Sequence, residues 1–220
     1  MLHFGAVDWR TDVYLNDIKI GSHEGGYTPF SFDIAPYLKS GEQKLVVKVW
    51  DPTDEGYQPR GKQIKNPNSI WYTPVTGIWQ TVWLEPVAKK HIADLKIVPN
   101  IDNSNLSVKA CIANSNGGEL FEVIVKDGAT IVGKGRAIAG HEAVVAIPNA
   151  KLWSPDSPFL YDLEVNLLEN NKTQDQVKSY AGMRKISMRR DKNQIVRLQL
   201  NNKDYFQIGP LDQGWWPDGL

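Results

Sequence analysis

Short stretches in which apolar and polar residues alternate run through almost the whole chain, and helical spacing is nearly absent. Phe30 and Phe32 alternate with Ser31, and Leu45–Trp50 is rich in β-branched and aromatic residues. An alternation of period two places every second side chain on the same face of a strand. The pattern therefore predicts an all-β protein.

Gly, Pro, Asn and Asp punctuate these stretches at regular intervals, which is typical of β-sandwiches. The predicted strands of a first series are Leu2–Val7, Asp12–Leu15, Asp17–Ile20, Leu45–Trp50 and Ile78–Leu84. Those of a second series are His91–Val98, Leu106–Ala113, Leu120–Lys126, Thr130–Gly133, Ala143–Ile147, Tyr161–Leu168, Gln176–Gly182 and Gln194–Leu200. We expect two consecutive β-sandwiches, followed by a short C-terminal hairpin in which Tyr205–Gln207 pairs with the last of these strands.

The two series are separated at Pro86–Lys90, where proline ends a strand and a short basic link follows. A second break falls at Met188–Asn193, a polar and basic stretch. These breaks predict a first domain over residues 1–88, a second over 89–188 and a terminal segment over 189–220.

The apolar content of individual strands predicts which side chains are buried. Leu45–Trp50 is apolar enough to be covered on both faces. Trp79 and Trp83 share one face of a predicted strand and are expected in the core. Cys111 lies in an apolar strand, where an inert buried thiol is expected.

Charge and cysteine content exclude several classes of function. The chain holds 25 Lys and Arg against 25 Asp and Glu, so it lacks the basic surplus of a nucleic-acid-binding protein. The single cysteine excludes an internal disulfide and a cysteine-based zinc cluster, and four scattered histidines suggest no metal site. No window approaches the roughly 20 apolar residues of a membrane span. No metal and no cofactor are predicted.

Asp51–Ser69 resists assignment to any strand and is held between two strongly apolar segments. Long anchored loops without structure of their own are usually functional, so we expect a functional loop here. Trp71, just after it, is equally suited to packing and to covering the apolar face of a sugar. The available acids cannot be paired from sequence as catalytic groups; they are Asp8, Asp12, Asp51, Asp54, Glu55 and Asp212.

Three long strings resemble the sugar-binding, jelly-roll domain of glycoside hydrolase family 2, which includes β-galactosidases, β-glucuronidases and β-mannosidases. They are Leu2–Asp54, Gln58–Gln63 (QPRGKQ) and Ile70–Val87 (IWYTPVTGIWQTVWLEPV). The following residues, His91–Ser187, are similar to the immunoglobulin-like sandwich of that family, notably at LWSPDSPFLYDLEV and YAGMRKI. Leu200–Leu220 resembles the entry to the catalytic (β/α)₈ barrel. The first sandwich is then expected to be a truncated jelly roll.

The resemblance implies a retaining glycosidase that cleaves O-glycosidic bonds, β-galactosidase-like, with carbohydrate as its partner. The two catalytic glutamates of the family lie on barrel strands, so no catalytic residue is carried over to this chain. The chain is expected to be the accessory part of such an enzyme, inactive alone, with one loop reaching the substrate pocket. A stand-alone carbohydrate-binding module is the alternative, and a scaffold without ligand is a third reading.

By the resemblance, Asp51 matches a position on the loop that helps to shape the substrate pocket in some members. The candidate substrate-binding residues are Asp51, Asp54, Arg60, Gln63, Trp71, Asp212 and Trp215. Neither a nucleic acid nor a membrane is expected as a partner. The sequence leaves open whether the parent forms a homo-oligomer and in which compartment it works.

Overall fold

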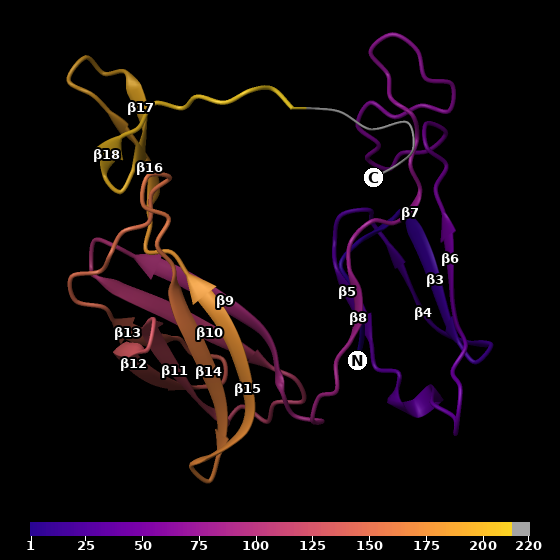
Figure 1. Cartoon of the computed structure of the whole chain (residues 1–220), viewed down its shortest axis with the longest axis horizontal. Coiled ribbons are helices and arrows are strands. Elements are labelled where there is room, and N and C mark those ends of the chain that lie inside the picture. Colours follow the sequence, from indigo (N-terminus) through magenta and orange to yellow (C-terminus); the bar gives the residue numbers. More distant parts are fainter. Residues whose placement is uncertain (213–220) are drawn as a thin grey trace. The chain divides into compact units, whose positions relative to one another are not determined.

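The computed structural model describes residues 1–212 and confirms the prediction of an all-β chain (Figure 1). Its regular structure is a succession of strands and one 3₁₀ turn, η1 (Ala35–Tyr37). The chain divides into two compact units, one containing Met1–Pro86 and the other Val87–Gly209. Each unit is described by itself below.

The first unit is built from three small antiparallel sheets. Their strands are β1 (Leu2–Phe4), β2 (Val7–Asp8), β3 (Arg10–Leu15), β4 (Ile18–Glu24), β5 (Phe30–Phe32), β6 (Leu45–Trp50), β7 (Gly77–Ile78) and β8 (Val82–Leu84). The strand orders are β5–β1–β8, β4–β3–β6 and β2–β7. Leu2, Phe4, Val7 and Val13 form its buried centre, because alternate residues of β1 and β3 point inward.

The second unit is a sandwich of two antiparallel sheets. One has the order β13–β10–β9, with strands Ala143–Ala146, Asn105–Ile112 and Ile92–Asn100. The other has the order β12–β11–β14–β15, with strands Thr130–Ile138, Leu120–Asp127, Tyr161–Glu169 and Lys172–Ala181. Their facing side chains form one large apolar core that includes Phe121, Val165 and Leu167.

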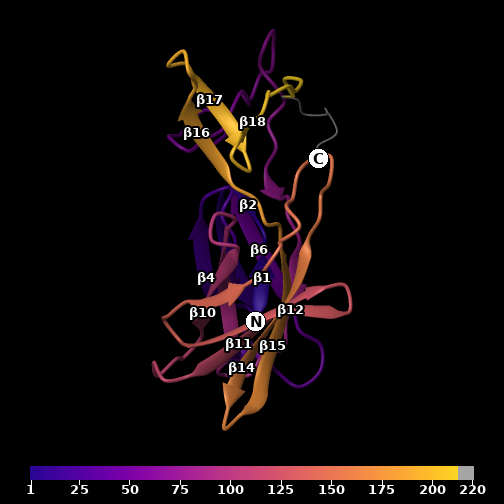
Figure 2. The ribbon, with the colours of Figure 1, turned by 90° about the vertical axis from the view of Figure 1, so that its left-hand side faces the viewer.

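A three-stranded sheet of order β16–β17–β18 ends the second unit, with strands Ile186–Arg190, Val196–Leu200 and Lys203–Asp204 (Figure 2). The predicted hairpin is present, with a return strand that begins earlier than expected: β17 pairs with β18 across the turn Asn201–Asn202, and the backbone N–H of Tyr205 donates a hydrogen bond to the carbonyl of Leu198 (3.0 Å). The other edge of β17 pairs over its whole length with β16, which was not predicted. The sequence missed β16 because its polar and basic end was interpreted as a break. The register places Met188 opposite Leu198 on one exposed apolar face of this sheet.

Three hairpins close through two-residue turns in which both residues have positive φ. The pairs are Asn16–Asp17, Asn170–Asn171 and Asn201–Asn202, with φ between 49° and 66°. Two consecutive left-handed residues define the turn that matches the twist of paired strands, and Asn and Asp adopt it more readily than other side chains. The predicted turn at Asn16 is confirmed, and its register pairs Leu15 with Ile18.

Three burial predictions were wrong, each for a reason of strand position. β6 packs against the core through Val47 and Val49 on one face only, and Trp50, on the opposite face, is 55% exposed. The segment 78–84 breaks into two short strands, which leaves Trp79 half-buried and Trp83 exposed rather than in the core. Cys111 is exposed because its neighbours Ala110 and Ile112 occupy the inward face of β10.

Candidate functional site

The chain between β6 and β7 forms an irregular loop held by the carboxylate of Asp51. Oδ1 of Asp51 accepts hydrogen bonds from the backbone N–H of Thr53 (2.8 Å) and from the amide of Gln58 (3.3 Å). Oδ2 accepts one from the hydroxyl of Thr76, 25 residues later (3.2 Å). The side chain therefore ties the beginning of the loop to its end, which fixes the path of the segment between them.

Gln63 is the other anchor of this loop and is buried. Its Oε1 accepts a hydrogen bond from the backbone N–H of Val75 (2.7 Å), and its Nε2 donates one to the carbonyl oxygen of Arg60 (3.1 Å). A primary amide has two N–H donors, so one donor of Gln63 is not used by this contact. Gln63 thus holds two limbs of the loop together and also lines the pocket described below.

The other candidate residues from the sequence serve the loop itself or lie away from the pocket. Asp54 accepts a hydrogen bond from the backbone N–H of Lys65 (3.3 Å), and the guanidinium of Arg60 lies 6.0 Å from the ring centre of Trp71. None of Asp54, Arg60 and Trp71 lines the pocket. Asp212 is exposed on the terminal segment, and Trp215 lies outside the described residues.

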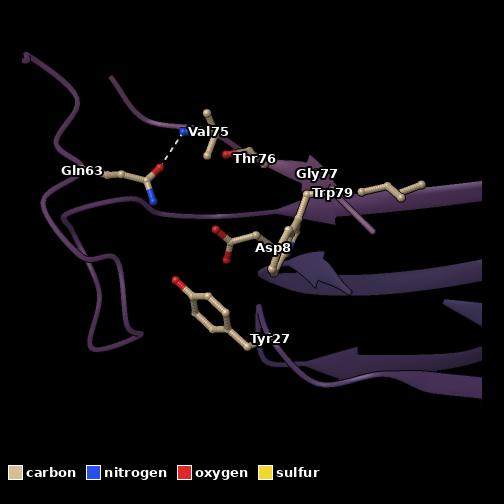
Figure 3. A pocket seen from close by; sticks show the side chains of 8 residues that line it. Asp8, Tyr27, Gln63, Val75, Thr76, Gly77 and Trp79 are labelled. Carbon is tan, nitrogen blue, oxygen red and sulfur yellow. Dashed lines mark hydrogen bonds between the residues drawn. The ribbon is translucent and has the colours of Figure 1, made fainter. Parts of the chain in front are cut away.

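A small pocket with a cavity volume of about 40 Å³ lies between this loop and the strand ends of the first unit. It is lined by Asp8, Tyr27, Gln63, Val75, Thr76, Gly77, Ile78 and Trp79. Figure 3 shows that the carboxyl group of Asp8 and the hydroxyl of Tyr27 point into the same space, with Gln63 on the facing wall. The volume is far below the roughly 300 Å³ of a complete small-ligand site, so the pocket has room for a single polar group and not for a whole sugar.

Backbone geometry places Asp8 and Tyr27 in this pocket. Asp8 ends β2, opposite Gly77 of β7, while Tyr27 follows the turn after β4. A methyl group at Gly26 would lie only 2.6 Å from Oδ1 of Asp8, so only glycine lets the turn pass this close to the carboxyl group. The indole N–H of Trp79 donates a hydrogen bond to the carbonyl of Gly26 (2.7 Å), which fixes the turn on the pocket wall.

Asp8 is the residue of this pocket whose pKa is shifted. Burial of its carboxyl group, and then the negative charge of Asp51, raise the pKa of Asp8 from its ordinary value of 3.8 to about 6. Within residues 1–212 this carboxyl group has no hydrogen-bond donor of its own. An acceptor without an internal donor, directed into a pocket, is free to bind donors from a ligand.

We expect Asp8→Asn to change how stability depends on pH. Folded Asp8 holds its proton more tightly than the unfolded chain does, so its contribution to stability is full below pH 3.8 and is lost as the pH rises towards 6. The variant lacks this loss, and its stability relative to the natural chain should therefore increase between pH 4 and pH 7. Urea unfolding of both proteins at several pH values measures the difference. Asp212→Asn, which removes an exposed carboxylate, is the control; a stability difference for Asp8→Asn that is constant with pH would contradict the assignment.

Sequence reasoning found one side of the site and missed the other. Of the predicted residues, Gln63 lines the pocket and Asp51 accepts a hydrogen bond from Thr76 of the lining, and their binding of a substrate stays a prediction. Tyr27, Thr76 and Trp79 also line the pocket and were not predicted. Asp8 was considered only as one of several unpaired acids. No sequence signal relates Asp8 to Asp51 across more than forty residues, although the glycine pair before Tyr27 marked a close approach of the backbone.

The described residues bring no three His, Cys, Asp or Glu side chains together as metal ligands. Among residues 1–212, no helix has the length and apolar character needed to cross a bilayer.

Comparison with known proteins gives two matches to one family. Residues 1–86 match the model for the sugar binding domain of glycosyl hydrolases family 2, and residues 90–184 match the model for glycosyl hydrolases family 2. A putative beta-glucuronidase from Formosa agariphila is 33% identical over 83% of this chain, and a beta-galactosidase from Thermoanaerobacter pseudethanolicus is 31% identical over 99% of it. The chain spans only 22% and 30% of these two proteins.

Solved structures share the same fold. A β-glucuronidase from Ruminococcus gnavus, in complex with a C6-substituted uronic isofagomine, superposes with a TM-score of 0.76 and 23% sequence identity. The similarity covers 94% of this chain and 36% of that protein. At this level of identity the superposition supports the arrangement of strands and no more.

Proposed function

The chain belongs to glycosyl hydrolases family 2, and from this we propose that it is the non-catalytic accessory part of a β-galactosidase-like retaining glycosidase that hydrolyses O-glycosidic bonds. Its two β units support the catalytic domain, and its loop between β6 and β7 forms part of the substrate rim. The folded loop supports the second role most directly, since Asp51 and Gln63 hold it as one wall of a polar pocket.

Among residues 1–212, Asp8 in the pocket lining and Asp51 behind it do not suit a catalytic pair. A retaining glycosidase needs a nucleophile and an acid that flank a bound sugar ring. The pocket between Asp8 and the loop is too small for a ring, and both oxygens of Asp51 already accept hydrogen bonds. This supports a binding role for the pair rather than a catalytic one.

We expect no hydrolysis of nitrophenyl β-galactoside or nitrophenyl β-glucuronide by the purified chain. The expected rate is that of the buffer alone, because the pocket beside the loop is too small to hold a sugar ring between a nucleophile and an acid. Absorbance of released nitrophenolate measures the rate, and a full-length family 2 enzyme is the positive control. Turnover that follows the chain through a second purification step would refute the accessory role.

Sugar binding distinguishes a loop at the substrate rim from a stand-alone carbohydrate-binding module and from a scaffold without ligand. A stand-alone module should bind a galactoside with an affinity that does not depend on another domain, and a pure scaffold should bind none. A rim loop should bind weakly alone, in the millimolar range, because one small pocket supplies few contacts. Titration of the chain with methyl β-galactoside, followed by amide resonances of Gln63 and Thr76, separates these outcomes.

A further inference from the structure

The sequence contains one asparagine that is followed by glycine, at Asn116–Gly117. In such a pair the backbone nitrogen of the glycine can attack the side-chain amide of the asparagine, because glycine has no Cβ to obstruct the approach. Both residues are exposed in the irregular loop between β10 and β11. Among residues 1–212, a Cβ added to Gly117 would meet no heavy atom within 4 Å beyond its chain neighbours, so the space around this nitrogen is open.

The reaction of this pair is a cyclisation followed by a hydrolysis. A base from solvent removes the N–H proton of Gly117, the nitrogen bonds to Cγ of Asn116, and the side-chain nitrogen takes up a proton and leaves as ammonia. Water then opens the resulting five-membered succinimide at one of its two carbonyl groups. One opening gives aspartate, and the other gives isoaspartate, in which the main chain runs through the former side-chain carbon. Water is the co-reactant, and no group is oxidised or reduced.

A single carboxylate holds the backbone N–H groups of both residues. Oε1 of Glu119 accepts a hydrogen bond from the N–H of Asn116 (2.8 Å), and Oε2 accepts one from the N–H of Gly117 (3.1 Å). The N–H of Gly117 also donates to Oγ of Ser115 (3.0 Å), whose hydroxyl donates to Oε2 of Glu119 (2.6 Å). The carboxylate is itself held in place, since its side chain is only 8% exposed and is paired with Lys90 (2.6 Å).

These contacts oppose both requirements of the cyclisation. The N–H of Asn116, and then Lys90 and Ser115, hold the pKa of Glu119 well below its ordinary value, so the carboxylate is ionised at neutral pH. Loss of the Gly117 proton would leave an amide anion 3.1 Å from this negative charge. The charge-assisted hydrogen bonds also resist the rotation about Asn116 that carries the nitrogen of Gly117 onto Cγ.

We propose that Asn116–Gly117 is an isoaspartate-forming site and that Glu119 restrains its reaction in the folded protein. The site lies in the second unit, so the inference is independent of the proposed function. Isoaspartate adds one atom to the main chain between the two N–H groups that Glu119 holds, and the new carboxylate places a like charge beside it. The modification therefore undoes the contacts that restrained it.

The test follows isoaspartate at Asn116 by mass spectrometry of tryptic peptides, after the whole chain has been kept at pH 8 and 37 °C. A synthetic peptide with the sequence of Ala113–Leu120 has the same reactive pair without the fold and supplies the unrestrained rate. We expect the folded chain to react at least tenfold more slowly than this peptide.

Glu119→Gln keeps the size of the side chain and removes its charge, so the rate at Asn116 should rise at least fivefold. Asn116 should then convert faster than Asn68 and Asn103, each of which is followed by serine. Ser115→Ala removes only the second acceptor of the Gly117 N–H and should give a smaller rise.

Glu122→Gln is the matched control for these variants. It removes the charge of a nearby carboxylate that is paired with Arg136 in β11 and β12, and it should leave the rate at Asn116 unchanged. Far-ultraviolet circular dichroism establishes that each variant is folded.

Equal rates in the folded chain and the peptide would overturn the restraint. A folded Glu119→Gln that reacts no faster than the natural chain would overturn the role of Glu119. If Glu119→Gln does not fold, Ser115→Ala decides in its place, and an unchanged rate in that variant refutes the proposal. Faster conversion of Asn68 or Asn103 than of Asn116 in folded Glu119→Gln would show that this pair is not the reactive site.

Discussion

Phe121→Ala should remove about 3–5 kcal/mol from the stability of the second unit, the largest effect we expect from a single substitution. Phe121 has no exposed surface and lies in β11, paired with Ala137 on one side and Leu167 on the other. Truncation to alanine leaves a cavity in the middle of the sandwich, which the paired neighbouring strands cannot close. A loss of this size is a large fraction of the stability of an ordinary domain.

Hydrogen exchange read by mass spectrometry measures this effect for each unit separately. Amides of β11 and β14 should lose protection in the variant, while those of β3 in the first unit keep it. Phe206→Ala makes the same chemical change at a ring that is 84% exposed and should alter little. Equal protection of β11 in Phe121→Ala and the natural chain would show that the core of the second unit is not organised around this ring.

Asp51→Ala should release the loop between β6 and β7 and abolish sugar binding at the pocket. The substitution removes the acceptor of three hydrogen bonds, from Thr53, Gln58 and Thr76. Hydrogen bonds to a charged group contribute about 1.5–3 kcal/mol each when buried. Because this carboxylate is half-buried and also repels Asp8, we expect a net cost of roughly 2 kcal/mol to the first unit.

The comparison with Asp51→Asn separates the hydrogen bonds from the charge. Asparagine keeps an oxygen that accepts from the backbone of Thr53, so the loop should retain most of its protection from exchange, and the pKa of Asp8 should fall towards 3.8. Titration with methyl β-galactoside should then show binding by Asp51→Asn and none by Asp51→Ala. Equal binding by both variants would show that the loop is positioned by other contacts.

The period of the sequence predicted the strands well because alternation and turn residues are local properties. β6 was predicted with its observed ends, and the hairpin around Asn16 was placed correctly. The position of a strand within a sheet is not local, and this is where the predictions failed. Leu45–Trp50 has the composition of a strand covered on both faces, but only Val47 and Val49 pack against the core, and Trp50 on the other face is exposed.

The pocket, too, combines features that nearby residues in the sequence predict with features that depend on contacts between distant residues. The loop was predicted from its length and from its proline and glycine residues, and Asp51 from the resemblance to glycoside hydrolase family 2. Asp8 acquires its properties only when β2 and β7 pair and bring it near Asp51 and Thr76. The position of Cys111, in contrast, was available from sequence, since Leu106, Val108 and Ala110 already define the inward face of its strand.

The three turns with consecutive left-handed residues have a consequence for how this surface tolerates variation. Asn16–Asp17, Asn170–Asn171 and Asn201–Asn202 contribute nothing to the apolar core, yet their backbone conformation excludes β-branched residues and proline. Natural drift at these six positions should be confined to Gly, Asn and Asp, while neighbouring exposed positions vary freely. A library that randomises the turns of this chain would therefore need to spare these six positions, or it would lose the strand pairing that each turn closes.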